Sequence, residues 1–143
     1  MKSRRRHLVV AVPTAIALAA LSQAPAVAAA NHWQVLYETP RHVKAEACRT
    51  PVHTTAQGHR SRAVRWRGDA RSASLGGSVQ FHNNGGIGPF TSGWVGMAKG
   101  RTSKITNTYF LANEAVTIQM RVKTAKGTSK WSARRSITSL RLC

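Results

Sequence analysis

The chain has 143 residues, and its 22 Lys and Arg stand against only four Asp and Glu, which gives a formal charge of +18 at pH 7. The electrostatic field of so large a positive charge repels other copies of the chain and attracts polyanions. The four carboxylates show no pair of the kind that glycoside hydrolysis needs, and no acidic cluster of the kind that calcium prefers.

The first thirty residues have the three-part layout of a secretory signal. Residues 2–6 are mostly basic, residues 8–21 are mostly apolar, and small residues follow up to Ala30. The apolar run is shorter than the roughly twenty residues that a membrane span requires. We therefore expect a secreted, extracellular protein whose signal peptide, residues 1–30, is removed after about Ala30, with cleavage after Ala28 as the alternative.

The signal also resembles two known groups of exported proteins. Arg4, Arg5 and Leu8 resemble part of a twin-arginine export signal, and the basic start of an ordinary Sec signal is the alternative. The signal and the Ala- and Arg-rich composition resemble exported proteins of high-GC Gram-positive bacteria. This resemblance implies a bacterial extracellular protein.

Cleavage would leave residues 31–143 as one secreted domain, in which 18 Lys and Arg oppose the four acids, for a charge near +14. Its only cysteines are Cys48 and Cys143, and an even pair in an oxidising compartment predicts one disulfide. In the chain-entropy model such a bond contributes about 4–5 kcal/mol. Two free thiols or an intermolecular bridge are the alternatives.

Short alternating runs of apolar and polar residues follow one another along this domain, separated by Gly, Asn, Ser and Thr. They predict roughly seven to nine short strands and an all-β fold, either a small antiparallel β-sandwich of the immunoglobulin or fibronectin III kind or a compact barrel. The expected strands lie near residues 33–37, 43–47, 63–67, 78–82, 94–98, 104–111, 116–122 and 131–137.

The last three strands have faces that can be assigned from the alternation. Residues 104–111 align Ile105, Tyr109 and Leu111 as the apolar face. Residues 116–122 place Val116, Ile118, Met120 and Val122 inward.

The returning strand, residues 131–137, is expected to have Trp131, Ala133 and Ile137 inward and Ser132, Arg134 and Ser136 outward. A change of phase beyond it predicts a bulge near Thr138 or Ser139.

The end of the chain resembles the last hairpin of a fibronectin type III domain. There an alternating strand leads through a Gly-containing turn to the pattern S-x-W-S. The matching residues here are Met120, Val122, Gly127, Ser129, Trp131 and Ser132, while Ile118 occupies the place of the family's corner tyrosine. The resemblance implies a β-sandwich that serves as a binding or spacer module rather than an enzyme.

No catalytic motif, metal site or cofactor site is predicted. Metal-free RNA cleavage requires only acid–base groups and cations for the phosphate, which leaves a ribonuclease-like enzyme as one alternative. In that case His42, His53, His59 or His82 would transfer protons, and Arg65 or Arg67 would hold the phosphate.

The alternation favours a non-catalytic binding module with a basic face. Arg121, Lys123 and Arg134 are expected to point outward, and Lys126 and Lys130 lie in the joining turn. Arg65 and Arg67 would extend this face if their strand belonged to the same sheet. Arginine donors in a fork suit phosphate and carboxylate groups.

The expected ligands are anionic extracellular polymers or cell-surface components: teichoic acid, acidic polysaccharide or nucleic acid. A monomer is expected. A secreted protease inhibitor or antimicrobial protein is the other alternative function.

Overall fold

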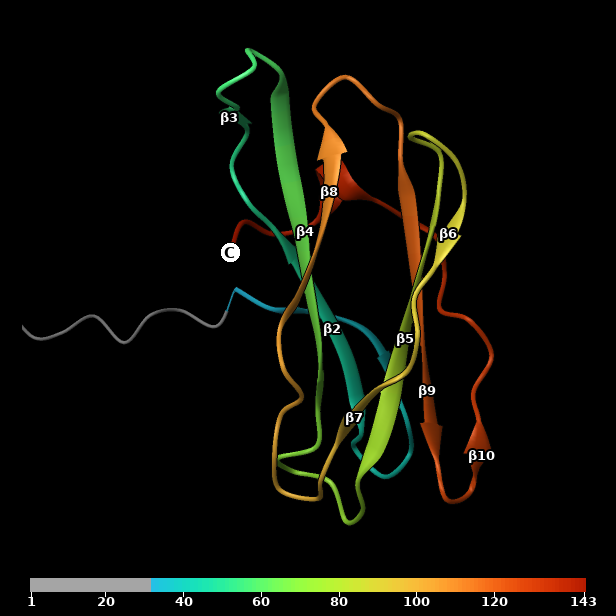
Figure 1. Cartoon of the computed structure of the whole chain (residues 1–143). Helices are drawn as coiled ribbons and strands as arrows, with labels where there is room; N and C mark the ends of the chain where they lie inside the picture. Colours follow the sequence, from blue (N-terminus) through green and yellow to red (C-terminus); the bar gives the residue numbers. More distant parts are fainter. Residues whose placement is uncertain (1–31) are drawn as a thin grey trace, which may run out of the picture. The chain divides into compact units, whose positions relative to one another are not determined.

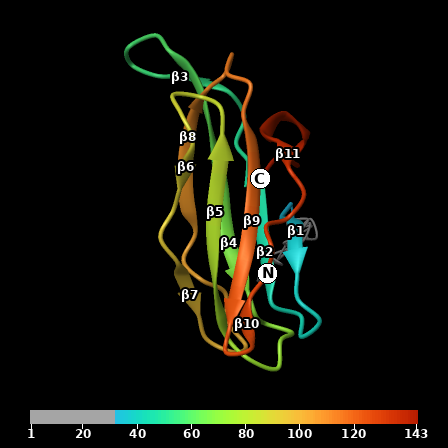
Figure 2. The same cartoon turned by 90° about the vertical axis from the view of Figure 1, so that its right-hand side faces the viewer.

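The computed structural model describes residues 32–143, and the predicted signal peptide lies outside the described residues. The described part is an all-β sandwich of two antiparallel sheets, which confirms the predicted fold class (Figures 1 and 2). Sheet A contains β1 (Gln34–Glu38), β2 (Lys44–Arg49), β3 (His53–Thr54), β4 (Arg60–Asp69) and β8 (Thr106–Leu111). Sheet B contains β5 (Gly77–Asn84), β6 (Phe90–Thr91), β7 (Val95–Met97), β9 (Thr117–Thr124), β10 (Gly127–Thr128) and β11 (Arg135–Ser136).

One long strand organises each side of the sandwich. In sheet A, β4 pairs with β2 along one edge and with β8 along the other, and β1 extends the sheet beyond β2. In sheet B, β5 pairs with β9, and the short strands β6 and β7 pair with its opposite edge. No helix among residues 32–143 is both long and apolar enough to cross a membrane.

The core lies between the two sheets and is built by alternation. Trp66 of β4 is the largest fully buried side chain, and its ring stacks on Phe81 of β5 with centroids 5.3 Å apart. The Trp66 Nε1–H donates a hydrogen bond to Thr108 Oγ1 at 3.1 Å, so its one polar group is satisfied. The inward face predicted for β9 is confirmed, because Val116, Ile118, Met120 and Val122 are all buried.

The face predicted for β8 is wrong. Ile105, Tyr109 and Leu111 are 43%, 65% and 39% exposed, whereas Phe110 is buried. The register with β4 explains the difference, because Thr108 is paired with Val64 and therefore shares its inward face. Both faces of β8 mix apolar and uncharged polar residues, so the alternation alone did not distinguish them.

The prediction for residues 131–137 is wrong at its start, for residues 131–133, whereas Ile137 is buried and Arg134 and Ser136 are exposed as predicted. Ser132 is buried, Ala133 is exposed, and Trp131 lies on the outer side of sheet B, where Arg121 stacks against it. Within residues 131–137 only β11 is regular strand. The predicted bulge is instead a 3₁₀ turn, η1 (Ile137–Ser139), in which Ile137 is buried.

Two serines account for this irregular course. The backbone N–H of Ser129 donates to Val122 O at 2.8 Å, and its Oγ accepts from Val122 N at 3.0 Å. Ser132 repeats both bonds with Met120, at 2.8 and 3.0 Å. From Ser129 to Ser132 the segment advances three residues, while its partners on β9 are only two residues apart. This extra residue breaks the strand alternation and turns Trp131 away from the core.

The predicted disulfide is confirmed. Cys48 at the end of β2 is bonded to Cys143, with Cα atoms 5.2 Å apart. Backbone bonds surround it, since Arg49 N donates to Arg141 O and Cys143 N donates to Arg49 O, each at 2.9 Å. The C-terminal segment is therefore held to sheet A by both hydrogen bonds and a covalent bond.

Candidate functional site

The seven cations predicted to bind a ligand do not form one patch. Arg65 and Arg67 are on β4 of sheet A, whereas Arg121 and Lys123 are on β9 of sheet B. The exposed residues Lys126, Lys130 and Arg134 lie in the turn after β9 and in the segment between β10 and β11. The condition that would have joined Arg65 and Arg67 to the basic face is therefore not met.

Arg67 is held in place by interactions within the domain. Its Nε donates to Glu46 Oε2 at 2.9 Å, and the side chains of this pair are only 13% and 4% exposed. The guanidinium also stacks on the Trp33 ring at 4.2 Å from the centroid. Because its charge is already paired inside sheet A, Arg67 has little capacity left for a ligand.

The outer face of sheet B carries an alternation of aromatic rings and cations. The Arg121 guanidinium lies 4.4 Å from the Trp131 centroid and 5.3 Å from that of Trp94. Its Nε donates to Gln80 Oε1 at 2.8 Å, and Lys123 Nζ lies 5.9 Å from the Trp94 centroid. Stacking and this hydrogen bond hold Arg121 in one orientation.

These contacts join Trp94, Arg121, Lys123 and Trp131. We use the name basic aromatic face for these four residues together with the exposed cations of the segment that follows β9, which are Lys126, Lys130 and Arg134. The predicted binding residues did not include Trp94 or Trp131, and Trp131 was expected in the core. The signal that could have identified Trp131 is the three-residue interval between Ser129 and Ser132, which breaks the two-residue period of a strand.

The carboxylates of the domain are already engaged. Glu46 pairs with Arg67, Asp69 with Arg71 and Glu38 with His42, and Glu114 Oε2 accepts the backbone N–H of Leu111. The eighteen Lys and Arg of residues 32–143 are the 22 of the chain less the four before residue 31. Only two of them pair with a carboxylate in this described part, so sixteen do not.

Asp69 remains ionised because of its partner. Burial acts to raise its pKa, but Arg71 donates to the carboxylate from its side chain and backbone and holds the pKa below the ordinary value of 3.8. The negative charge of Asp69 is therefore balanced by Arg71, and the pair adds little to the electrostatic potential around more distant cations.

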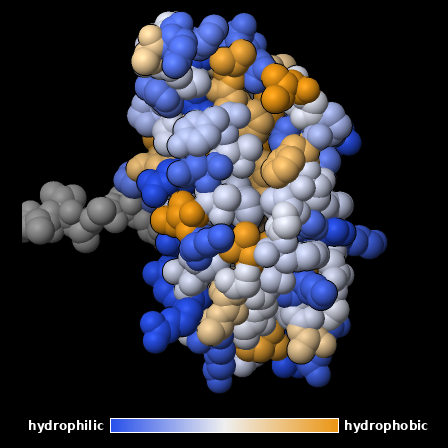
Figure 3. Space-filling model, viewed as in Figure 1, coloured by the Kyte–Doolittle hydropathy of each residue, from blue (hydrophilic) through white to orange (hydrophobic). Residues whose placement is uncertain are grey.

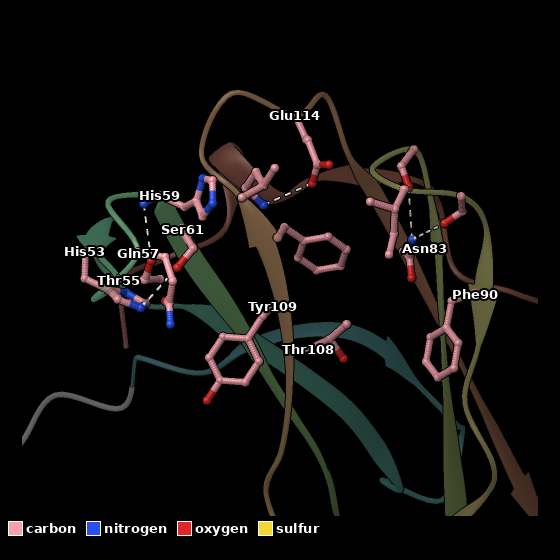
Figure 4. A pocket seen from close by; sticks show the side chains of 15 residues that line it. His53, Thr55, Gln57, His59, Ser61, Asn83, Phe90, Thr108, Tyr109 and Glu114 are labelled. Carbon is pink, nitrogen blue, oxygen red and sulfur yellow. Dashed lines mark hydrogen bonds between the residues drawn. The ribbon is translucent and has the colours of Figure 1, made fainter.

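An open groove of about 770 Å³ lies at one end of the sandwich (Figure 4). The segment from β3 to β4 forms one side, β8 lies in the middle, and the segment from β5 to β6 forms the other side. Figure 3 shows apolar side chains gathered near the end of the molecule where β8 terminates. The described residues that line the groove include Tyr109, Phe110 and Phe90 but no Lys or Arg.

The histidines proposed for acid–base chemistry are dispersed. His53 and His59 line the groove, with His53 Nε2 at 3.1 Å from Ser61 Oγ. His42 contacts Glu38 in the turn after β1, and His82 Nδ1 lies 2.7 Å from Thr91 Oγ1. Neither Arg65 nor Arg67 lines the groove, so the phosphate-holding cations proposed with these histidines lie elsewhere.

Comparisons with known proteins identify no relative of this chain. No protein-family model, no curated protein and no solved structure matches this chain.

Proposed function

We propose that the domain is a secreted, non-catalytic binding module that holds anionic polymers on its basic aromatic face. The observation that carries the proposal is the charge imbalance: sixteen of the eighteen Lys and Arg of the described domain have no carboxylate partner within it. A surface of this kind attracts polyphosphates and polycarboxylates over distances comparable with the Debye length.

The basic aromatic face suits this role better than sheet A does. Lys123, Lys126 and Lys130 are exposed, and Arg134 is exposed as well. Trp94 is 37% exposed beside Lys123 and adds a flat apolar surface next to the charge. On sheet A, by contrast, Arg67 is paired and Arg65 is half-buried.

We infer that the domain is a binding or spacer module related to fibronectin type III domains, and the order of its strands is compatible with this. In the lettering of immunoglobulin-type sandwiches, β2, β4 and β8 take the order A, B, E. The strands β7, β5, β9 and β10 take the order C′, C, F, G, and β1 is an additional strand beside A. The bonds of Ser129 and Ser132 to β9 lie in the S-x-W-S segment that carried the sequence resemblance.

Export to an oxidising compartment is part of the proposal. It rests on the expected signal peptide and on the Cys48–Cys143 disulfide, a bond that persists mainly outside the cytosol.

The proposal predicts strongly salt-dependent binding. The mature chain should bind immobilised heparin and poly(glycerol phosphate) teichoic acid at low ionic strength. A plot of log K against log [NaCl] should have a slope of about −3 or steeper, because each neutralised phosphate or sulfate releases close to one counterion.

Neutral dextran on the same support is the control and should retain nothing. Binding of the two polyanions that persists unchanged in about 1 M NaCl would contradict the proposal, because the charges would then be screened within about 3 Å.

A further inference from the structure

The strand β8 is an edge of sheet A with free backbone groups. Among the described strands it pairs only with β4. The backbone N–H of Ala112 donates to Arg60 O, so by alternation Phe110 and Thr108 also direct their backbone groups toward β4. Asn107 and Tyr109 therefore direct their N–H and C=O groups away from the sheet, whereas those of Leu111 bond to Glu114.

The other sheet edges in the described domain carry features that discourage pairing. The edge strands β6, β10 and β11 have two residues each and β7 has three, and β1 contains a register shift between Val35 and Tyr37. Natural proteins protect edges in these ways, and also with charged residues. The strand β8 has six residues, a continuous register and no charged residue.

The side chains beside this edge are apolar in a strongly cationic domain. Tyr109 and Leu111 are exposed on one face of β8, and Ile105 is exposed just before the strand. Across the groove Phe90 is exposed, and Ile87 is completely exposed. Asn83, which also lines the groove, has a buried Oδ1 without a partner, while its amide nitrogen donates to the carbonyl oxygens of Gly85 and Gly88.

From these observations we propose that β8 binds an extended segment of an acidic partner protein, which adds to sheet A as a further antiparallel or parallel strand. Main-chain hydrogen bonds to Asn107 and Tyr109 would supply the affinity, and alternate side chains would contact Tyr109 on one face and the Phe110 and Phe90 side on the other.

The charges near the two ends of β8 indicate the composition of the partner segment that would bind there. The strand itself is uncharged, and Lys104 precedes it. At its other end Arg60 and Arg62, which both bond with Ala112, outnumber Glu114, whose carboxylate accepts the Leu111 N–H. The complementary sequence has uncharged, alternating side chains in the centre and Asp or Glu at both ends. A second copy of this domain fits poorly, because two charges near +14 would repel each other.

The test uses nonapeptides with five alternating Val and Thr residues in the centre and two Asp residues at each end, with the mature chain as the receptor. We expect binding in the micromolar range and at least tenfold slower hydrogen exchange at the Asn107 and Tyr109 amides in the bound state. Peptides in which the central residues are N-methylated should bind at least tenfold more weakly, because they cannot donate to the strand.

Two variants connect this binding to β8. Asn107→Pro removes an N–H that does not face β4 and should weaken peptide binding at least tenfold. Tyr109→Lys leaves the backbone intact, places a charge at the edge and should have a similar effect even if the proline variant folds poorly. Arg135→Ala, an exposed cation on β11 of the opposite sheet and outside the basic aromatic face, is the control and should bind the peptides as the parent chain does.

Any of four results would overturn the proposal: no binding of the peptides, binding that both β8 variants retain, a concentration-dependent dimer that Asn107→Pro abolishes, or retention of neutral oligosaccharide that Tyr109→Lys abolishes. None of these results bears on polyanion binding, because heparin and teichoic acid retention is measured separately and depends on another sheet.

Discussion

Replacement of Trp66 by Ala should lower the free energy of unfolding by about 3–5 kcal/mol. The indole is 1% exposed and joins the two sheets by stacking on Phe81. Removing it would leave a cavity at the centre of the sandwich and would also leave Thr108 Oγ1 without its donor. Urea denaturation followed by far-UV circular dichroism measures the change.

A second tryptophan provides the matched control. Trp131 is half-buried on the outer face of sheet B, where its ring contacts the Arg121 guanidinium and the His82 ring. Trp131→Ala should therefore lower the free energy of unfolding by only about 1 kcal/mol. Equal losses in the two variants would show that Trp66 does not form the centre of the core.

Removal of the disulfide, by Cys48→Ser together with Cys143→Ser, should lower the free energy of unfolding by about 2–5 kcal/mol. The bond closes a loop with a sequence separation of 95 residues, so the unfolded chain without it gains many conformations. The corresponding fall in melting temperature is about 10–25 °C.

The folded state should survive this change, since the backbone of Arg49 can still bond to residues 141 and 143, and its Nε can still donate to the Leu140 carbonyl oxygen. A near-native circular dichroism spectrum at low temperature is expected. Dithiothreitol should lower the melting temperature of the parent chain to that of the double variant and leave the variant unaffected. A melting temperature that differs by less than about 2 °C between the two chains would contradict the prediction.

The sequence was sufficient to predict the structural features that depend on a strict alternation of apolar and polar residues. In β9 and the residue before it, four apolar residues alternate with Thr117, Gln119, Arg121 and Lys123, so only one face can be buried. The disulfide was likewise predictable, because the chain has only two cysteines, which allow a single intramolecular pairing, and the expected export implied an oxidising compartment.

Features that depend on tertiary context were not predictable. The inward face of β8 is decided by its register with β4 and by the Thr108 hydroxyl that satisfies Trp66, neither of which is visible in the residues of β8 itself. The outward position of Trp131 depends on serine hydroxyls that bond to another strand. The separation of Arg65 and Arg67 from Arg121 is a matter of sheet order, which alternation does not encode.

The most direct test of the proposed function compares two variants with the same loss of charge. The first replaces Lys123, Lys126, Lys130 and Arg134 of the basic aromatic face by Ala, and the second replaces the exposed residues Lys99, Lys104, Arg101 and Arg141 by Ala. Affinity for heparin at about 0.1 M NaCl is measured for both. The first variant should lose at least about tenfold and the second less than about threefold, because local contacts release the counterions. Equal losses in the two variants would show that net charge alone, and not this face, is responsible for binding.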